Sequence, residues 1–433
     1  MPERGVRRSV VLCKWQPELL VALLDDGATV HLVLDRYDRF QDTADDLLAR
    51  CRSVYRISSF DSVEEVAEVA VDLRLSGAEI DLVLSHNEWS QFGAGYLELL
   101  LGTAQDPLLR VSHRDKRLMK QRVRAAGVTT ARFVSVPDAS DPAAAATVVR
   151  DLPLPVVVKP AAGYGAVSTV RVDDAARLPE VLAGFTFDPL LHSRQLIVEE
   201  FITGVELAVD AIWSNGEALA FVVHRYRDAR MTMAEPTKLD GSWVLRPADH
   251  QETYDRLREV HRRINPVLGI HEGASHMEVF VRPDGEVVFS EIATRPAGGW
   301  APVMLRAYLG RPVWDLLAQV LLHGTAPAPR PSDRYVGAVH LRPAKPGVIS
   351  RAPEDAELAA CPGIVTWQRI RGVGDRARFS HPSEFYLHVA IEADTPDELE
   401  ALAARVAEQF PIETTGDRAA STERLRGARR AGA

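Results

Sequence analysis

The first ninety residues alternate short apolar runs with amphipathic stretches, and this alternation constrains the fold more than any other feature of the sequence. The apolar runs are RSVVLCKW, TVHLVLD, SVYRIS and IDLVLSHNE. QPELLVALLDDG and DSVEEVAEVAVDLRLSG, which lie between them, have helical patterns. Strands that alternate with helices predict βαβ units and a parallel sheet. No Gly-x-Gly-x-x-Gly follows the first strand, which disfavours a Rossmann-type NAD-dependent oxidoreductase.

Length, charge and composition exclude several classes of protein. A chain of 433 residues is too long for one hydrophobic core and predicts two to four domains. The net charge of −9 argues against a nucleic-acid partner or an anionic membrane surface. No apolar run reaches the length of a membrane span, the N-terminus lacks a signal-peptide pattern, and the three cysteines have no metal-like spacing. We therefore expect a cytoplasmic protein with no membrane partner.

Helix and linker signals mark the middle and the end of the chain. SHRDKRLMKQRVRAAG predicts a helix over about 112–126, with Ser112 as its N-cap, Asp115 at the third helical position and Gly127 after its end. The Pro-rich stretch PAPRPSDRY leads into a last α+β unit. The Arg/Ala/Gly-rich segment 416–433 is predicted to be disordered.

The segment VVVKPAAGYGAVST places a lysine before a loop of small residues. Lys159 stands at the end of a β-branched run, and Gly163, Gly165 and Ser168 follow. Glycine lets backbone N–H groups approach phosphate oxygens, and a lysine adds a positive charge beside them. A hairpin turn with a solvated lysine explains the same residues equally well.

The segment HMEVFVRPDGEVVFSEIATRPAGG predicts a β-hairpin around a Pro-Asp-Gly turn. If Glu278 faces Glu291, the two carboxylates repel unless a divalent cation such as Mg²⁺ lies between them. A slip of one residue would send them to opposite faces. The sequence leaves the register open, and a hairpin with one exposed Glu and one Glu paired to an Arg is the alternative.

Taken in order, these segments resemble a known family. Lys116 in RDK, Lys159 in VVVKP, the small-residue loop, VEEFITGVE, and the Glu278/Glu291 pair closed by Arg295 resemble the ATP-grasp superfamily from about residue 8 to residue 325. Within it, the chain looks most similar to the carboxylate–amine ligases, particularly L-amino acid ligases that make dipeptides. Outside this combination, the glutamates of VEEFITGVE could equally be solvated edge charges.

The resemblance implies an α/β and α+β architecture with the ATP-grasp fold. A Rossmann-like N-terminal domain, the pre-ATP-grasp domain, would precede the ATP-grasp domain, and an α+β domain would close the chain. The implied boundaries are 1–110 for the first domain, 111–325 for the ATP-grasp domain with a lid at about 128–198, 326–415 for the C-terminal domain, and 416–433 for the tail.

The resemblance also implies which residues bind ATP. Lys159 would reach the α/β-phosphates, the 163–168 loop would close over the phosphates, Glu199 with the backbone of its neighbours would hold adenine, and Glu206 would hold the ribose. The implied ATP-binding residues are Lys116, Lys159, Gly163, Gly165, Ser168, Glu199, Glu200, Ile202 and Glu206.

For the metal and the chemistry, the resemblance implies three further roles. Glu278 and Glu291 would hold one or two Mg²⁺ ions, and Arg295 would neutralise an acyl phosphate or a substrate carboxylate. The sequence departs from the family at Ala293, where many members have an Asn metal ligand. His276 stands where some relatives carry an Arg that contacts the γ-phosphate, so it would bind phosphate or substrate; a structural histidine is the alternative.

The activity implied is ATP-dependent amide formation. A carboxylate attacks the γ-phosphate of ATP, and an amine then attacks the acyl phosphate, with Lys159, Arg295 and His276 as the catalytic side chains. His224, His271 and His276 are candidates for the base that deprotonates the amine. The partners expected are small-molecule substrates, either amino acids or amines. Homodimers are common in the family, but the sequence does not decide the oligomeric state.

Two rival functions remain. A biotin-carboxylase-like enzyme is the nearer one, because HLRPAKPGVI resembles the closing domain of that branch. Carboxylases of that branch usually carry Glu-His after the arginine, whereas Pro-Ala-Gly-Gly follows Arg295 here. A non-catalytic nucleotide sensor would be expected to lose a lysine or a metal carboxylate, and this chain keeps them apart from the Asn position.

Overall fold

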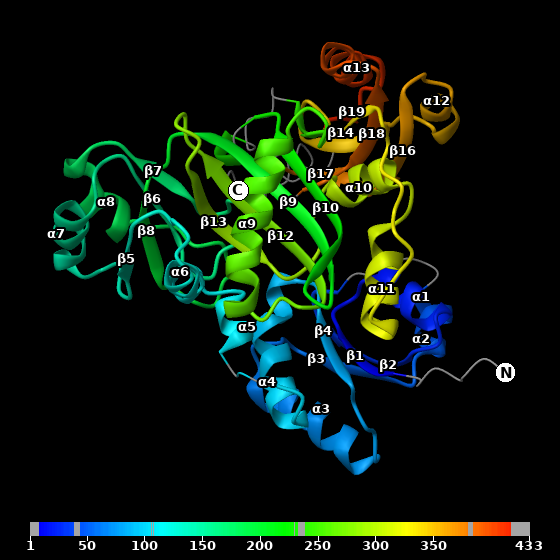
Figure 1. The fold of residues 1–433 in the computed structure, drawn as a ribbon, viewed down its shortest axis with the longest axis horizontal. Coiled ribbons are helices and arrows are strands. Elements are labelled where there is room, and N and C mark those ends of the chain that lie inside the picture. The colour runs from blue at the N-terminus through cyan, green and yellow to red at the C-terminus, as the bar shows by residue number, and fades with distance from the viewer. Residues whose placement is uncertain are drawn as a thin grey trace, which may run out of the picture. The chain divides into compact units, whose positions relative to one another are not determined.

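Figure 1 shows the fold in a computed structural model of the chain. The structure describes residues 8–38, 44–104, 106, 108–228, 230–232, 239–379 and 384–416. The chain forms two compact units. Unit 1 comprises 1–224, 247–297 and 311–330, and unit 2 comprises 225–246, 298–310 and 331–433. The three-domain boundaries expected from the sequence stay a prediction, and all but the first residue of the tail at 416–433 lies outside the described residues.

The N-terminal part of unit 1 is the expected parallel sheet (blue in Figure 1). Its strands are β1 Ser9–Cys13, β2 Thr29–Asp35, β3 Ser53–Ile57 and β4 Leu82–Ser85, in the order β3-β2-β1-β4. The connecting helices are α1 Pro17–Asp25, α2 Ala44–Arg50 and α3 Val63–Leu75. Every pairing is parallel. Buried side chains such as Val11, Val33 and Leu73 form the core between the sheet and its helices.

The helix expected over 112–126 begins at Lys116 in the structure and ends at Ala125. The elements after β4 are η1 Glu88–Ser90, α4 Gln91–Leu101, α5 Leu109–Ser112 and α6 Lys116–Ala125. The expectation that Ser112 caps this helix was wrong, because Ser112 ends α5. Asp115 is the N-cap of α6, since its carboxylate accepts a hydrogen bond from the N–H of Arg117 and satisfies a donor at the helix end. Gly127, with φ of +76°, follows the end of α6 as expected.

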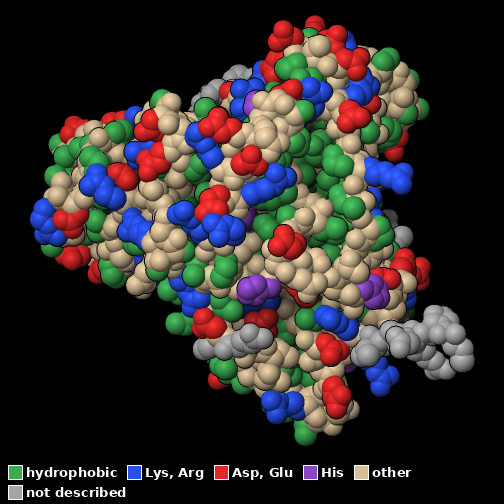
Figure 2. All heavy atoms as spheres, in the orientation of Figure 1, with side chains coloured by type: hydrophobic (Ala, Val, Ile, Leu, Met, Phe, Trp, Pro, Cys, Tyr) green, Lys and Arg blue, Asp and Glu red, His purple; other side chains and the backbone are tan. Residues whose placement is uncertain are grey.

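A small antiparallel sheet carries the small-residue loop. Its strands are β5 Phe133–Val136, β6 Val156–Pro160, β7 Val170–Val172 and β8 Leu196–Glu200, in the order β5-β8-β6-β7. The helices α7 Pro142–Asp151 and α8 Leu178–Ala183 pack on it through residues such as Val148 and Leu182. In the space-filling view, charged side chains of both signs are interspersed over this part of the surface (left in Figure 2).

Unit 1 contributes four long strands to a second antiparallel sheet. They are β9 Val205–Ser214, β10 Glu217–Tyr226, β12 Gly273–Val281 and β13 Val287–Ala293, in the order β13-β12-β9-β10. The helices α9 Gln251–Val267 and α11 Val313–His323 belong to the same unit. The Asn215-Gly216 turn joins β9 to β10 with both residues at positive φ, as a type I′ hairpin requires. Both hairpins predicted from the sequence are therefore confirmed.

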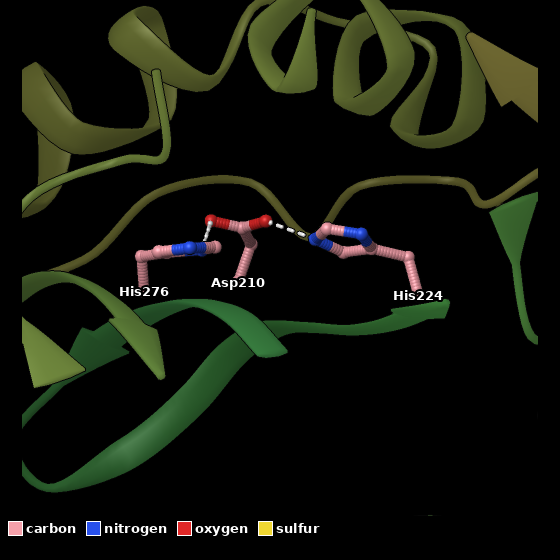
Figure 3. A group of neighbouring side chains, drawn as sticks. All are labelled: Asp210, His224 and His276. Carbon is pink, nitrogen blue, oxygen red and sulfur yellow. Dashed lines mark hydrogen bonds and ion pairs between the residues drawn. The ribbon is translucent and has the colours of Figure 1, made fainter. Parts of the chain in front are cut away.

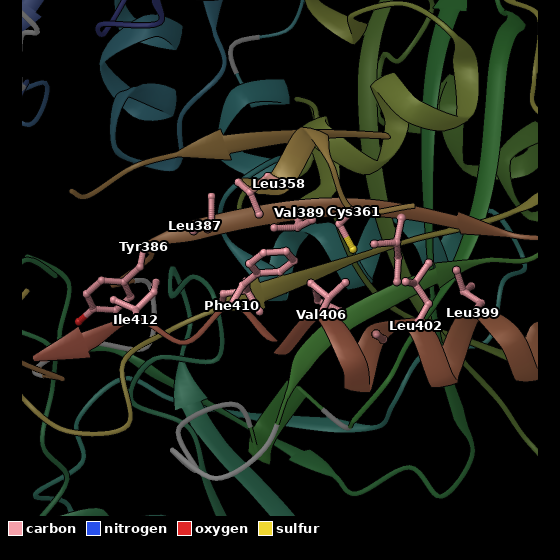
Figure 4. Close-up of a cluster of buried hydrophobic side chains, with 14 of the residues drawn as sticks. Leu358, Cys361, Tyr386, Leu387, Val389, Leu399, Leu402, Val406, Phe410 and Ile412 are labelled. Carbon is pink, nitrogen blue, oxygen red and sulfur yellow. The ribbon is translucent and has the colours of Figure 1, made fainter. Parts of the chain in front are cut away.

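Unit 2 has a hydrophobic core of its own, built on antiparallel strands. Its strands are β11 Asp240–Val244, β14 Tyr335–Leu341, β18 Leu387–Ala393 and β16 Ile364–Arg369 in that order, with β15 Gly347–Arg351, β17 Arg376–Ala377 and β19 Glu413–Thr415 in a small separate sheet. Its helices are α10 Ala301–Leu309, α12 Asp355–Ala359 and α13 Pro396–Gln409. Leu402, Val406 and Phe410 of this region face Val389 in the core (Figure 4). Within the described residues, no helix is long and apolar enough to cross a membrane.

Candidate active site

Strands β9, β12 and β13 place acidic side chains on one face of the unit 1 sheet. Glu278 stands directly opposite Glu291 across the β12–β13 pair. On the other side of β12, His276 stands opposite Asp210 of β9. Alternate residues of a strand share a face, so Glu206, four residues before Asp210, lies on the same face. Of the two registers that the sequence allowed, the structure has the one that brings the two carboxylates together.

The Glu278/Glu291 pair has the chemistry of a divalent-cation site. Residues directly opposite in an antiparallel pair have Cβ atoms about 5 Å apart, and two carboxylates at that spacing repel each other. Both side chains remain partly accessible, at 20% and 29%. Mg²⁺ and Mn²⁺ both bind carboxylate oxygens that are accessible in this way. These residues therefore fit the cation that the sequence led us to expect.

The first turn of α6 joins this carboxylate pair to the small-residue loop. Lys116 Nζ lies 3.2 Å from Glu291 Oε2 and donates a hydrogen bond of 2.9 Å to the carbonyl oxygen of Gly163. Arg114 donates a second bond, of 2.6 Å, to the same carbonyl. Two cationic side chains thus hold the start of the loop beside a metal-type carboxylate.

The rest of the loop includes residues with left-handed backbone conformations. Gly165 and Ser168 both have φ of +53°, in the left-handed region that favours glycine. Ser168 Oγ accepts a hydrogen bond of 2.9 Å from the N–H of Asp188, which fastens the end of the loop. The expected contacts of Gly163, Gly165 and Ser168 with ATP phosphates stay predictions.

Glu199 lies between two lysines. Lys159 Nζ is 2.9 Å from one carboxylate oxygen and Lys120 Nζ is 3.3 Å from the other. Burial alone would raise the pKa of Glu199, but the two ammonium groups outweigh burial and hold it below its usual value. Burial lowers the pKa of Lys120 to about 8 despite this partner. Lys120 was missed in the sequence, although it stands four residues after Lys116 and so on the same helix face.

The other residues expected around adenine and ribose have these positions. Glu200 forms an ion pair of 3.1 Å with Arg132, beside β5. Ile202 is buried against Ala131 and Val288. Their expected backbone contacts with adenine, and that of Glu206 with ribose, stay predictions.

Arg295 is fixed by a glutamate that the sequence analysis did not single out. Its Nη2 and Nε donate bonds of 2.7 and 3.1 Å to Glu88 Oε1. Arg114 Nη1 lies 3.5 Å from the other oxygen of Glu88. Burial favours the protonated form of Glu88, but the guanidinium groups of Arg295 and Arg114 outweigh it and lower the pKa of the carboxyl. Glu88 follows β4, so the N-terminal sheet positions the arginine that follows β13.

Asp210 lies between two histidine rings, as Figure 3 shows. Its Oδ1 accepts a bond of 3.1 Å from His276 Nδ1, and its Oδ2 accepts one of 2.8 Å from His224 Nε2. His276 Nε2 lies 3.4 Å from Glu278 Oε1. Burial lowers the pKa of His276, but the carboxylates of Asp210 and Glu278 outweigh burial and raise it to about 10. The protonated ring thus neutralises charge beside the carboxylate pair.

Of the three histidines proposed as bases, the structure brings two together. His224 and His276 share Asp210, whereas His271 lies exposed before β12. Asp210 was missed, yet a carboxylate within the apolar run of VELAVDAIWS needs a buried partner. That requirement is the signal that could have found it.

Comparisons with known proteins show which family and fold the chain resembles. The family model of the ATP-grasp domain matches residues 152–303. An L-arginine-specific L-amino acid ligase from Bacillus subtilis is 23% identical over 342 residues, which cover 78% of this chain and 81% of that protein. A D-alanine–D-alanine ligase from Paenarthrobacter aurescens is 28% identical over 253 residues, or 54% of this chain and 64% of that ligase. The crystal structure of an L-amino acid ligase from Bacillus licheniformis superposes with a TM-score of 0.74 at 17% identity, covering 95% of this chain and all of that one, and this likeness shows the fold.

Proposed function

The chain carries an ATP-grasp domain and has the ATP-grasp fold, and from this premise we propose that it is an ADP-forming carboxylate–amine ligase. It joins the carboxylate of an amino acid to an amine, supplied by a second amino acid, through an acyl phosphate. The observation that carries the proposal is the shared sheet face on which Glu278 and Glu291 meet, with Lys116 bound to Glu291. The two ligases among its relatives support this reaction class.

The cationic side chains are arranged for phosphoryl transfer. The transferring phosphoryl group carries charge on its oxygens, and positioned cations stabilise it most when water is excluded. Lys116 is buried beside Glu291 and Lys159 is partly buried beside Glu199, and both ammonium groups can turn to phosphate oxygens when ATP is bound. Mg²⁺, held by Glu278 and Glu291, would supply further positive charge to the ATP phosphates.

Arg295 binds the substrate carboxylate that is activated. Its two bonds to Glu88 use Nε and Nη2, and its Nη1 donates to the carbonyl oxygen of Pro296. A guanidinium with a fixed plane can bind a carboxylate or an acyl phosphate in one orientation. Arg114 and Lys116 hold Gly163 nearby, so loop closure and phosphate binding involve the same group of cations. A closed loop would protect the acyl phosphate from hydrolysis.

Two further features belong to the proposal. The substrates are small molecules, either amino acids or amines, as for the amino acid ligases among the relatives, and the cytoplasm is the expected location.

The route through an acyl phosphate can be tested with labelled oxygen. Amino acids with ¹⁸O in the carboxylate are incubated with the whole chain, ATP and Mg²⁺, and the phosphate and nucleotide products are examined by mass spectrometry. The proposal predicts one ¹⁸O atom in inorganic phosphate and ADP as the nucleotide. Label in AMP would show that the carboxylate attacks the α-phosphate, and it would contradict the proposal.

A further inference from the structure

Ala293 and His276 stand directly opposite each other across the β12–β13 pair, on the face that carries Glu278 and Glu291. The methyl group of Ala293 offers no metal ligand, and the imidazole of His276 lies across from it. We propose that His276 Nε2 is a third ligand of the divalent cation held by Glu278 and Glu291, and that the site therefore prefers Mn²⁺ to Mg²⁺. This inference rests on the proposed function and names its metal.

The spacing of the atoms supports a shared ion. Two ligands that are each about 2.1 Å from one cation lie roughly 3.0–3.4 Å apart when the angle between them is that of an octahedral or tetrahedral site. His276 Nε2 lies 3.4 Å from Glu278 Oε1. Glu291 stands opposite Glu278 on the same face. One nitrogen and two carboxylates therefore approach one another from two neighbouring strands.

The other side of the His276 ring is held as metal-binding histidines usually are. Such a histidine donates its second ring N–H to a carboxylate or carbonyl, which fixes the tautomer and the direction of the ring. His276 Nδ1 has that bond, of 3.1 Å, to Asp210 Oδ1. Asp210 is itself fixed by the ring of His224 and by the N–H of Ala297, at 2.8 and 3.2 Å. Asp210 and His224 are therefore positioning residues that aim Nε2 at the carboxylate pair.

The choice of ion follows from the donor atoms. Mg²⁺ prefers oxygen ligands in near-ideal octahedra, whereas an imidazole nitrogen is better suited to a first-row transition metal. A bound cation takes the place of the Nε2 proton of His276 and keeps the charge of Asp210 and Glu278 balanced. The three protein ligands leave positions open for phosphate oxygens and water.

Electron spin-echo spectroscopy of Mn²⁺ reports directly whether nitrogen is bonded to the metal. The whole chain is loaded with Mn²⁺ and ADP, once with natural histidine and once with ¹⁵N-histidine. We expect a nitrogen coupling strong enough for a direct bond, which changes on ¹⁵N labelling and so cannot come from adenine. His276→Asn should abolish this coupling and weaken Mn²⁺ binding by about tenfold, while Mg²⁺ binding changes by less than about threefold.

Two further variants separate ligation from fold. Asp210→Asn should keep the nitrogen coupling but weaken Mn²⁺ binding, because it loosens the ring without removing the ligand. His323→Asn is the matched control, since His323 also pairs with a carboxylate, Asp26 at 2.9 Å, but on α11 away from the carboxylate pair; it should leave spectrum and affinity unchanged. A labelled coupling that persists in His276→Asn, or none in the wild type, overturns the inference. Formation of ADP and amide product by the same preparation would show that the proposed function survives that result.

Discussion

Substituting Glu88 by Gln should impair catalysis more than it impairs folding. The glutamate accepts two bonds from Arg295, 2.7 and 3.1 Å long, across 207 residues of sequence. Gln keeps one oxygen acceptor but removes the negative charge and adds an N–H pair that faces Arg114. Arg295 would then lose its fixed plane, and displacement of a substrate-positioning group by about 1 Å costs roughly 100-fold in rate.

The cost in stability follows from burial. Breaking a fully buried ion pair costs about 3–5 kcal/mol, and an exposed pair contributes about 0–1 kcal/mol. The side chains of Arg295 and Glu88 are 20% and 17% exposed, between these limits. We therefore expect the free energy of unfolding to fall by about 2 kcal/mol, which is too little to unfold the protein.

A matched control is available in the same region. Arg110 and Glu98 form an ion pair of 2.7 Å whose side chains are 17% and 18% exposed. Glu98→Gln should therefore cost a similar free energy of unfolding, measured by urea titration, and leave the rate of ADP formation near that of the wild type. If Glu88→Gln loses no more activity than Glu98→Gln, Glu88 does not position Arg295 and this reasoning is refuted.

Three other perturbations test separate parts of the account. Glu291→Ala should abolish ADP formation and leave the fold intact by circular dichroism. Full activity in this variant would show that Glu291 is not a metal ligand. The free energy of unfolding should fall as the pH drops from about 6.5 towards 4. Burial lowers the pKa of three histidines, so below pH 6.5 the unfolded chain binds protons that the folded chain does not bind. Each of these histidines should lower the free energy of unfolding by about 2 kcal/mol at pH 5. These rings are His113, His261 and His388, with pKa values of about 4, 4 and 3. A urea midpoint that does not move between pH 7 and 5 would contradict their neutrality. Gly216→Ala should cost about 1 kcal/mol from backbone strain alone, since φ is +81° and its Cβ would meet no atom within 4 Å; an unchanged urea midpoint would argue against the type I′ turn.

Most of the correct fold predictions came from the local periodicity of apolar residues. The four strands of the parallel sheet and both hairpins follow from apolar patterns and turn residues within a few positions of one another. The helix start was misplaced because Ser112 and Asp115 are both good N-caps, and only the structure shows which side chain accepts a backbone bond. Capping depends on the path of the chain before the helix, which the sequence does not specify.

The site residues could be predicted where they lie close together in the sequence, within one motif. The Glu278/Glu291 pair lies within one hairpin, so the sequence narrowed it to two registers. Glu88 was missed because its partner is 207 residues away and nothing at either position encodes that pairing. Asp210 was different, since a carboxylate in a buried strand already requires a partner. Its two histidines come from separate strands, and the sheet register alone identifies them.

The central claim is that the chain couples ATP cleavage to amide formation, and one measurement tests it most directly. The protein is incubated with ATP and Mg²⁺, or Mn²⁺, and a matrix of amino acids taken singly and in pairs. ADP, AMP, phosphate and any new amide are then quantified by mass spectrometry. We expect ADP and an amide in equal amounts, formed only with particular pairs of amino acids. AMP formation, or ADP formation that needs bicarbonate and no amine, would contradict it, and the bicarbonate result would favour the biotin-carboxylase-like alternative.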